Sequence, residues 1–301
     1  MRKSRNQGSR VHPVTPGVES RRRRNDVLSI AFCSLVFAFS FAGCRQQVSR
    51  ELPTDLDRLA TSPGPGAVPV ARPWVAAAID ATGGMDDWVL VEKLAFEGIV
   101  TAYNEEGTAY LTEHQFDLYP WLDAIQITAV EPEGQFVWQF VGGEERLLEG
   151  DWTLTVSPLS DVYRRYAEAV LQITTAPVRM VDRYVSVSRR PTPTQIGGQW
   201  YDPLEAKFRP RPPVTAGDPD ESEPLVEPYW TEGAYFQNQD RLITDVIWLG
   251  NPIAQDYLVV RGYDYAPMGD RGVLVPAKIE LFESGPDAQV GRRIALVDVI
   301  R

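Results

Sequence analysis

Cys44 has the clearest chemistry in this chain, because its thiol follows a pattern that directs a protein to a membrane. Four consecutive arginines, Arg21–Arg24, precede an apolar run from Val27 to Ala42. Small residues end this run, and Gly43 stands directly before the cysteine. A basic region, an apolar core of about 15 residues and a small-residue cleavage site together make a secretory signal. The sequence therefore predicts export with removal of residues 1–43.

The segment Phe41-Ala42-Gly43-Cys44 resembles the lipobox of bacterial lipoproteins, in which a diacylglyceryl group is attached to the cysteine and the chain is cut just before it. Residues 1–43 are then a lipoprotein signal peptide, and lipidated Cys44 anchors the protein in the bacterial cell envelope, facing the periplasm or the cell surface. One alternative is a transmembrane anchor, although the run is shorter than the roughly 20 residues that span hydrocarbon. The others are an ordinary cleaved signal that leaves a free thiol, and twin-arginine export.

Removal of residues 1–43 makes the chain strongly acidic. That segment holds eight of the 30 Lys and Arg residues and two of the 41 Asp and Glu residues, which leaves 22 basic and 39 acidic residues and a formal net charge of −17. Such a charge repels phosphate backbones, so nucleic acid is not expected as a partner. It also repels anionic bilayers, so membrane contact is expected through the lipid on Cys44. With Cys33 removed, the folded part has no disulfide and depends on its core.

His114 is the only histidine after residue 43, which restricts the available chemistry. No second histidine exists for a metal pair, and neither HExxH nor GxSxG occurs. The acidic stretch 218–223 lacks the central glycine and the final glutamate of a calcium loop, so we interpret it as a solvated loop. The sequence predicts no catalytic residue, no metal site and no cofactor. A hydrolase with paired carboxylates is the least supported alternative, because no such pair can be identified.

The chain is expected to contain one domain behind a tether. Prolines and glycines recur in residues 44–72, which predicts a disordered tether that holds residues 73–301 off the membrane. The domain begins with a short helix over 74–81, which ends at Gly83-Gly84 because glycine adopts the left-handed conformation of a helix stop. Apolar and polar residues then alternate with a period of two. This pattern predicts an antiparallel meander with strands at 93–101, 110–118, 124–130, 135–141, 144–148, 233–237, 242–249, 256–265, 272–282 and 292–300.

One amphipathic helix interrupts the predicted strands. It starts at Ser157-Pro158, a favoured N-cap and first position, and its apolar stripe, which includes Val162 and Val170, continues to Ile173. We expect this stripe to cover the sheet as a lid, while Arg164, Arg165 and Glu168 face away. Residues 189–229 are rich in proline and predict an insertion or a surface loop, with a short strand at 201–208.

Aromatic residues are abundant in the predicted domain. Alternation places Phe136, Trp138 and Phe140 on one face of a strand, and Phe96 lies on an alternating strand expected to share that face. One interpretation is a core packed with aromatic side chains. The other is an apolar cavity that these residues line, since an unclosed barrel with a helical lid leaves such a space. Periodicity does not separate the two.

The segment AAIDATGGMDDWVLVEKLAFEGIVTAY resembles the N-terminal pattern of the LolA/LolB-like superfamily of periplasmic lipoprotein carriers, in which a helix, a Gly-Gly turn, an acidic-aromatic pair and a first strand follow in this order. The final strands, from Tyr257 to Val299, fit as well. The resemblance covers about residues 73–301. It implies a mainly β fold with a few helices: a curved antiparallel sheet that forms an unclosed barrel with a helical lid.

The resemblance also implies a function. Relatives bind acyl chains, lipids or lipidated proteins in the concave face without catalysis, so we expect Phe96, Phe136, Trp138, Phe140, Val162 and Val170 to line such a site. Two features depart from the family pattern: the acidic turn 131–134, where the anchored receptor type has an exposed apolar residue on a loop, and the proline-rich stretch 189–229. The alternative is a structural or protein-interaction module of the envelope with a filled core and an unknown protein partner.

Overall fold

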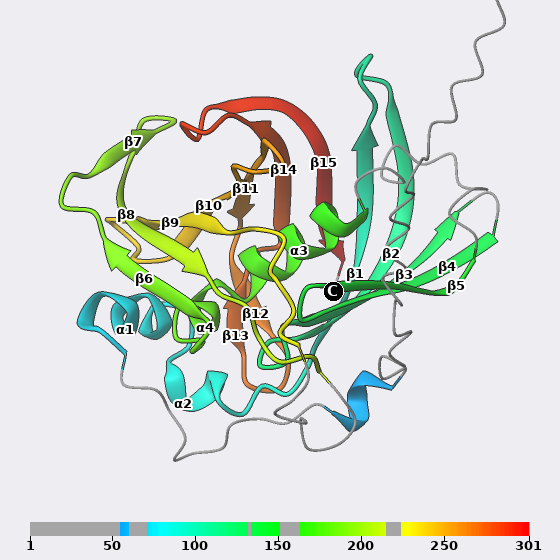
Figure 1. Cartoon of the computed structure of the whole chain (residues 1–301), viewed down its shortest axis with the longest axis horizontal. Coiled ribbons are helices and arrows are strands. Elements are labelled where there is room, and N and C mark those ends of the chain that lie inside the picture. Colours follow the sequence, from blue (N-terminus) through cyan, green and yellow to red (C-terminus); the bar gives the residue numbers. More distant parts are fainter. Residues whose placement is uncertain (1–54, 60–70, 132–133, 151–162, 215–223, 301) are drawn as a thin grey trace, which may run out of the picture. The chain divides into compact units, whose positions relative to one another are not determined.

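The structure, a computed structural model, describes residues 55–59, 71–131, 134–150, 163–214 and 224–300 (Figure 1). The signal peptide, the lipidation site Cys44, the lid residue Val162 and the acidic stretch 218–223 lie outside these residues. Within the described ranges, no helix combines the length and the apolar character needed to cross a membrane.

The fold is mainly β. The described helices are short: η1 (Leu56–Arg58, a 3-10 turn), α1 (Pro73–Asp80), α2 (Met85–Trp88), α3 (Tyr163–Thr174) and α4 (Ala176–Arg179). The strands are β1 (Leu94–Tyr103), β2 (Ala109–Tyr119), β3 (Ala124–Glu131), β4 (Gly134–Val141), β5 (Glu144–Glu149), β6 (Val185–Arg189), β7 (Thr194–Ile196), β8 (Gln199–Phe208), β9 (Glu232–Asn238), β10 (Thr244–Asn251), β11 (Asp256–Tyr263), β12 (Ala266–Met268), β13 (Val273–Val275), β14 (Lys278–Ser284) and β15 (Val290–Ile300).

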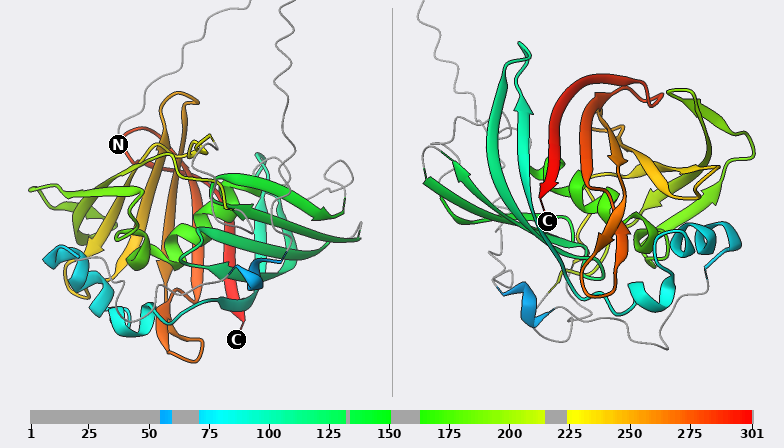
Figure 2. Two further views of the ribbon diagram at one scale, coloured as in Figure 1. Left: turned by 60° about the horizontal axis from the view of Figure 1, so that its bottom comes forward. Right: turned by 180° about the vertical axis from the view of Figure 1, so that it is seen from behind.

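Thirteen of these strands form one antiparallel sheet that is not closed into a barrel. Its order is β5-β4-β3-β2-β1-β15-β14-β11-β10-β9-β8-β6, with β7 paired to β8, so β5 and β6 are the two ends. The last strand, β15, pairs with the first, β1, and joins the N-terminal meander to the C-terminal one. Figure 2 shows the resulting curvature of the sheet around its helices. The predicted unclosed antiparallel sheet is confirmed.

The chain order explains why a helix covers the concave face. The N-terminal meander ends at β5, on one end of the sheet, and the C-terminal meander starts at β6, on the other. The connection between them contains α3 and α4 and must cross from one end of the open sheet to the other. Helix α3 accordingly contacts β3 and β4 from one meander and β10, β11 and β14 from the other. The predicted helical lid is therefore present.

The opening helix and its stop agree with the sequence pattern. Pro73 occupies the first turn of α1, where its missing N–H leaves no hydrogen bond unmade. Gly83 and Gly84 follow with φ of 125° and 88°, which disfavour any other residue. The indole N–H of Trp88 donates to the Thr82 hydroxyl oxygen at 3.1 Å and closes the turn between α1 and α2.

The short strand predicted at 201–208 is present as β8, but the rest of the proline-rich stretch differs from its prediction. Its first half belongs to the large sheet: β7 and β8 occupy Thr194–Ile196 and Gln199–Phe208, and β6 ends at Arg189. Pro203 lies within β8 and is tolerated because its carbonyl still accepts a hydrogen bond, from the backbone N–H of Arg190 at 2.9 Å. Only the residues after Phe208 leave the sheet, so the insertion is shorter than the sequence predicts.

The predicted tether also contains a docked turn. Leu56, at the start of η1, is buried against Tyr119, Ala124 and Val141. Next to it, the Asp57 carboxylate accepts a hydrogen bond from the Tyr119 hydroxyl at 2.9 Å and pairs with Lys93 at 2.8 Å. Residues 55–59 therefore pack on the domain, which corrects the expectation of a tether without structure over all of 44–72.

The core occupies the concave side of the sheet, and a smaller cluster occupies part of the outer side. The main core joins α1, α2 and α3 to the inward side chains of both meanders. On β10 the residues alternate, so Ile247 and Leu249 enter the main core while Trp248 packs on the outer face. The outer cluster comprises Tyr201, Phe236, Val246, Trp248 and Val259.

Candidate functional site

The candidate site is the concave face of the N-terminal meander, where strand register aligns large apolar side chains. Phe96 stands opposite Phe116, Phe116 opposite Ile127, and Ile127 opposite Trp138. The rings of Phe96 and Phe116 stack with centroids 4.8 Å apart. Because opposed residues share a face of the sheet, these four side chains form one row across β1 to β4, and Phe96 shares the face of Trp138 as expected.

Phe136 and Phe140 lie two residues before and after Trp138 on β4, on the same face. All three are buried in the main core together with Phe96 and Val170. The structure thus brings five of the predicted lining residues into one core, whereas Val162 lies outside the described residues. Their surfaces are covered by protein, and α3 packs in the same core.

Helix α3 is buried on every side from Tyr166 to Thr174. Its apolar residues Val170 and Ile173 pack in the main core, as the stripe predicts. Its polar residues differ from the prediction: Arg164 and Arg165 are half-buried rather than exposed, and Glu168 is only 5% exposed. A second layer of protein, formed after Phe208, covers the side of the helix that the sequence pattern places in water.

Polar contacts fasten the first turn of α3 to both meanders. The Arg164 guanidinium donates to the backbone carbonyl of Gly143, between β4 and β5, at 2.6 Å. Arg165 pairs with Asp256 at the start of β11 at 2.8 Å. The same carboxylate accepts a hydrogen bond from the Tyr229 hydroxyl at 2.5 Å. The helix start is thus held to the β4–β5 turn on one side and to the start of β11 on the other.

Two further polar contacts lie deeper, under the helix. The Tyr166 hydroxyl is 2.9 Å from Nδ1 of His114 on β2, where the histidine ring also contacts the Trp138 ring edge-on. The Tyr235 hydroxyl, on β9, donates to Oε1 of Gln172 at 3.0 Å. His114, interpreted from the sequence as an ordinary strand residue, is therefore a buried contact of the lid. This contact could not be predicted from the sequence, because the alternation along one strand does not show that Tyr166 of α3 lies against His114.

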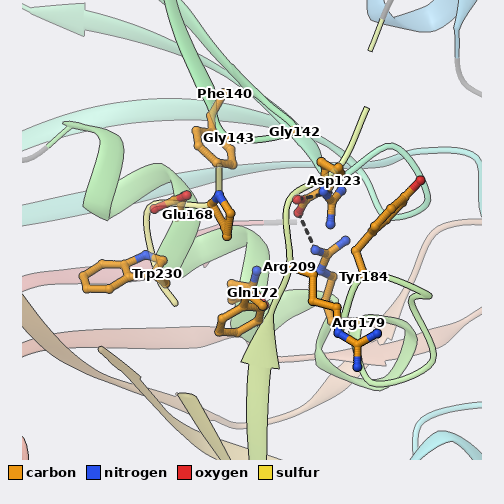
Figure 3. A pocket seen from close by; sticks show the side chains of 13 residues that line it. Asp123, Phe140, Gly142, Gly143, Glu168, Gln172, Arg179, Tyr184, Arg209 and Trp230 are labelled. Atoms are coloured by element: carbon orange, nitrogen blue, oxygen red, sulfur yellow. Dashed lines mark ion pairs between the residues drawn. The ribbon is translucent and has the colours of Figure 1, made fainter. Parts of the chain in front are cut away.

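Residues 224–231, called the strap here, pass over the outer side of α3 (Figure 1). Arg164 stacks on the ring of Tyr229 with 4.7 Å between its guanidinium carbon and the ring centroid. The Val226 backbone pairs with that of Arg211, which attaches the strap to the segment after β8. Trp230 is buried beside Glu168 at a small cavity (Figure 3).

This cavity has a volume of about 30 Å³. Room of this size suits water rather than a drug-sized ligand, whose sites measure some 300–1,000 Å³. Its walls combine aromatic and charged side chains with the amide of Gln172; the others are Asp123, Phe140, Glu168, Arg179, Tyr184, Phe208, Arg209, Arg211 and Trp230. Burial raises the pKa of Glu168 to about 8, so this carboxyl is mostly protonated at neutral pH.

A network of four charged side chains stands beside the cavity, and Figure 3 labels the two buried ones, Asp123 and Arg179. Asp123 pairs with Arg179 and with Arg211, both at 2.9 Å. Asp182 pairs with the same two arginines at 3.0 and 3.1 Å. Burial alone would raise the pKa of Asp182, but the two guanidiniums hold it below its usual range. The network joins the β2–β3 turn, α4 and the segment that leads to the strap.

Within the described ranges, no cluster of three or more His, Cys, Asp or Glu side chains is placed to hold a metal ion. Ile253, in the turn between β10 and β11, is the most exposed of the large apolar side chains described, at 92%.

No protein-family model matches the chain, and no curated protein sequence matches it. Among solved structures, the fold is similar to a LolA superfamily protein from Nitrosomonas europaea, at 8% identity and a TM-score of 0.44 over 75% of this chain and 90% of that one. It is also similar to a DUF1329 family protein from Desulfovibrio piger, at 9% identity and a TM-score of 0.38 over 76% and 90% of the two chains.

A third similar structure is a domain from Vibrio parahaemolyticus assigned to outer membrane lipoprotein sorting, at 6% identity and a TM-score of 0.36 over 69% of this chain and 83% of that one. The solved structures to which this fold is similar thus include a LolA superfamily protein.

Proposed function

We propose that this protein binds a hydrophobic ligand, without catalysis, on the concave face of its sheet after α3 moves aside. The observation that supports this function most directly is that α3 buries polar as well as apolar side chains. A helix that only completes a core needs apolar residues at its buried positions, whereas α3 buries Tyr166, Glu168 and Gln172. When the helix moves, water can replace the hydrogen bonds of Tyr166 and Gln172 and can solvate Glu168.

The surface beneath α3 suits an acyl chain. Phe96, Phe116, Ile127 and Trp138 form an uninterrupted apolar row, and burial of apolar area contributes about 25 cal/mol per Å² whichever chain covers it. A lipid, or the acyl groups of a lipidated protein, would therefore replace the apolar contacts that α3 loses. The acidic exterior disfavours anionic headgroups, so the chain of the ligand rather than its headgroup is expected to dominate binding.

A second candidate function is a structural or protein-interaction module with a permanently filled core. The packed interior favours it, because the described lining residues of the concave face are buried in the main core, and the cavity beside the strap measures only about 30 Å³. The two functions differ in whether α3 leaves the sheet. Ligand entry is therefore the decisive observation.

Cys44 is proposed as the membrane anchor of either function, in the cell envelope. We expect Cys44→Ser to abolish acylation, because only a thiol at this position accepts the diacylglyceryl group, and to shift the protein from the detergent phase to the aqueous phase in a phase-partition experiment. Cys33→Ser, inside the signal run, is the matched control and should leave partitioning unchanged. Wild-type partitioning of the Cys44→Ser protein would contradict the anchor.

The ligand site is tested with a photoactivatable fatty acid added to membranes that contain the full chain, followed by mapping of the cross-linked peptides. We expect cross-links in β1 to β4 and in α3. Trp138→Phe removes roughly 40 Å² of apolar surface, worth about 1 kcal/mol, so labelling should need about five times more probe. Phenylalanine keeps an aromatic ring in the core, whereas alanine at this fully buried position would leave a destabilising cavity.

Trp248→Phe is the matched control, because Trp248 packs on the outer face of the same sheet. It should not change labelling of β1 to β4. Equal effects of the two variants, or labelling confined to segments outside the concave face, would contradict the ligand function. The absence of any label in the domain would favour the filled-core function.

A further inference from the structure

Glu168 is the carboxyl of α3 that lies beside the strap residue Trp230 at the small cavity (Figure 3). It is 5% exposed. Its Oε2 accepts no hydrogen bond from any described residue. The indole N–H of Trp230 is close enough to favour the charged form slightly, yet it makes no hydrogen bond of normal geometry. A charge on this carboxylate would therefore have at most the water that the cavity of about 30 Å³ holds, and it would lack a full complement of donors.

The groups around Glu168 do not compensate for its burial. On its own helix, Arg164 favours the charged form, but that guanidinium already bonds the Gly143 carbonyl and stacks on Tyr229. Asp123, from the β2–β3 turn, and Glu145, from β5, both oppose ionisation.

The remaining charged and titratable groups at this cavity are Arg179, Arg209, Arg211 and Tyr184. Arg179 and Arg211 are neutralised by Asp123 and Asp182. Loss of water is consequently the main influence on Glu168, and it raises the pKa to about 8 from a usual value of 4.5.

We propose that Glu168 is a proton-controlled latch: protonated, it lets α3 stay seated between the sheet and the strap, and ionised, it drives α3 out and opens the concave face. The latch proposal rests on the proposed function at one point: it takes the concave face as the ligand site. The latch itself needs no ligand, because it depends on the different solvation of one carboxyl in the seated and the displaced helix.

The direction of the effect follows from the pKa values. In the displaced helix Glu168 is in water and has its usual pKa, so the seated state binds the proton more tightly. The seated state is most favoured below pH 4.5, and this preference is lost as pH rises toward 8. Within this window each pH unit changes the ratio of displaced to seated helix by about tenfold, because one proton is released on opening.

Hydrogen exchange of the full chain in detergent tests the latch. After correction for the intrinsic exchange rate, the opening constant of the α3 amides from Tyr166 to Thr174 should rise about tenfold per pH unit between pH 5 and 8. Glu168→Gln keeps the size and shape of the side chain without a titrating group, so its opening constant should be independent of pH. Glu145→Gln, which removes a neighbouring carboxylate, is the matched control and should keep the wild-type slope.

A wild-type opening constant that does not change with pH would overturn the latch, and so would a slope that survives in Glu168→Gln. Fatty-acid labelling of the concave face separates this result from the proposed function. If the concave face is labelled but the opening constant of the α3 amides does not change with pH, the latch is refuted and the ligand function is not. A tenfold slope that Glu168→Gln abolishes, without labelling, supports the latch and refutes the ligand function.

Discussion

Replacing Val170 with aspartate is expected to lower the free energy of unfolding by about 3–5 kcal/mol. Val170 is fully buried at the centre of α3, in the main core of the concave side. The carboxylate would lose its water without gaining a partner, and it would either remain charged at high cost or take up a proton. Urea unfolding followed by tryptophan fluorescence measures the change, and the transition should move to lower urea without a change of slope.

Val290→Asp is the matched control for this prediction. Val290, at the start of β15, is 40% exposed, so the same chemical change should alter stability by no more than about 0.5 kcal/mol. If Val170→Asp were as stable as Val290→Asp, α3 would not be seated on the sheet. The lid, and with it the latch at Glu168, would then be wrong.

Asp123→Asn is the second change with a large expected effect, again about 3–5 kcal/mol of stability. It leaves the guanidiniums of Arg179 and Arg211 with Asp182 as their one carboxylate, and Arg179 is only 2% exposed. Asparagine keeps the shape of the side chain and tolerates the left-handed backbone at this position, where φ is 54°. The loss therefore reports the missing charge rather than strain. Thermal or urea unfolding measures it.

Asp298→Asn is the corresponding control at the surface. Asp298 pairs with Lys278 at 3.3 Å, and both side chains are more than 40% exposed. Exposed pairs contribute about 0–1 kcal/mol because water and salt screen them. A similar small effect at Asp123 would mean that water reaches the four-charge network. The network could not then anchor the segment that leads to the strap.

Much of the concave face could be predicted from the sequence, because the signals are local. Period-two alternation put Phe136, Trp138 and Phe140 on one face of β4, and Gly83-Gly84 ended the first helix where its backbone conformation requires glycine. Helical spacing placed Val170 in the core. Each pattern depends on neighbours a few residues away, and backbone geometry converts such spacing directly into a shared face.

Proline composition was a less reliable guide than alternation. It led residues 189–229 to be interpreted as an insertion or a surface loop with only a short strand at 201–208, whereas β7 and β8 both join the large sheet, with Pro203 inside β8. A proline in a strand is acceptable when its carbonyl is used and its missing N–H is not needed. Whether a strand proline meets both conditions depends on the neighbouring strand, and the sequence of β8 does not identify that strand.

Tertiary structure alone decided which polar groups lose water. Glu168 lies on the polar side of an amphipathic helix, and it is buried because the strap, some 60 residues later in the chain, passes over it. Leu56 is likewise buried by Tyr119, Ala124 and Val141, from strands that follow it by more than 60 residues. Local sequence specifies which face of an element is apolar, whereas the burial of its other face depends on long-range contacts. For that reason the sequence predicted the lid helix, and only the fold revealed the carboxyl proposed to control it.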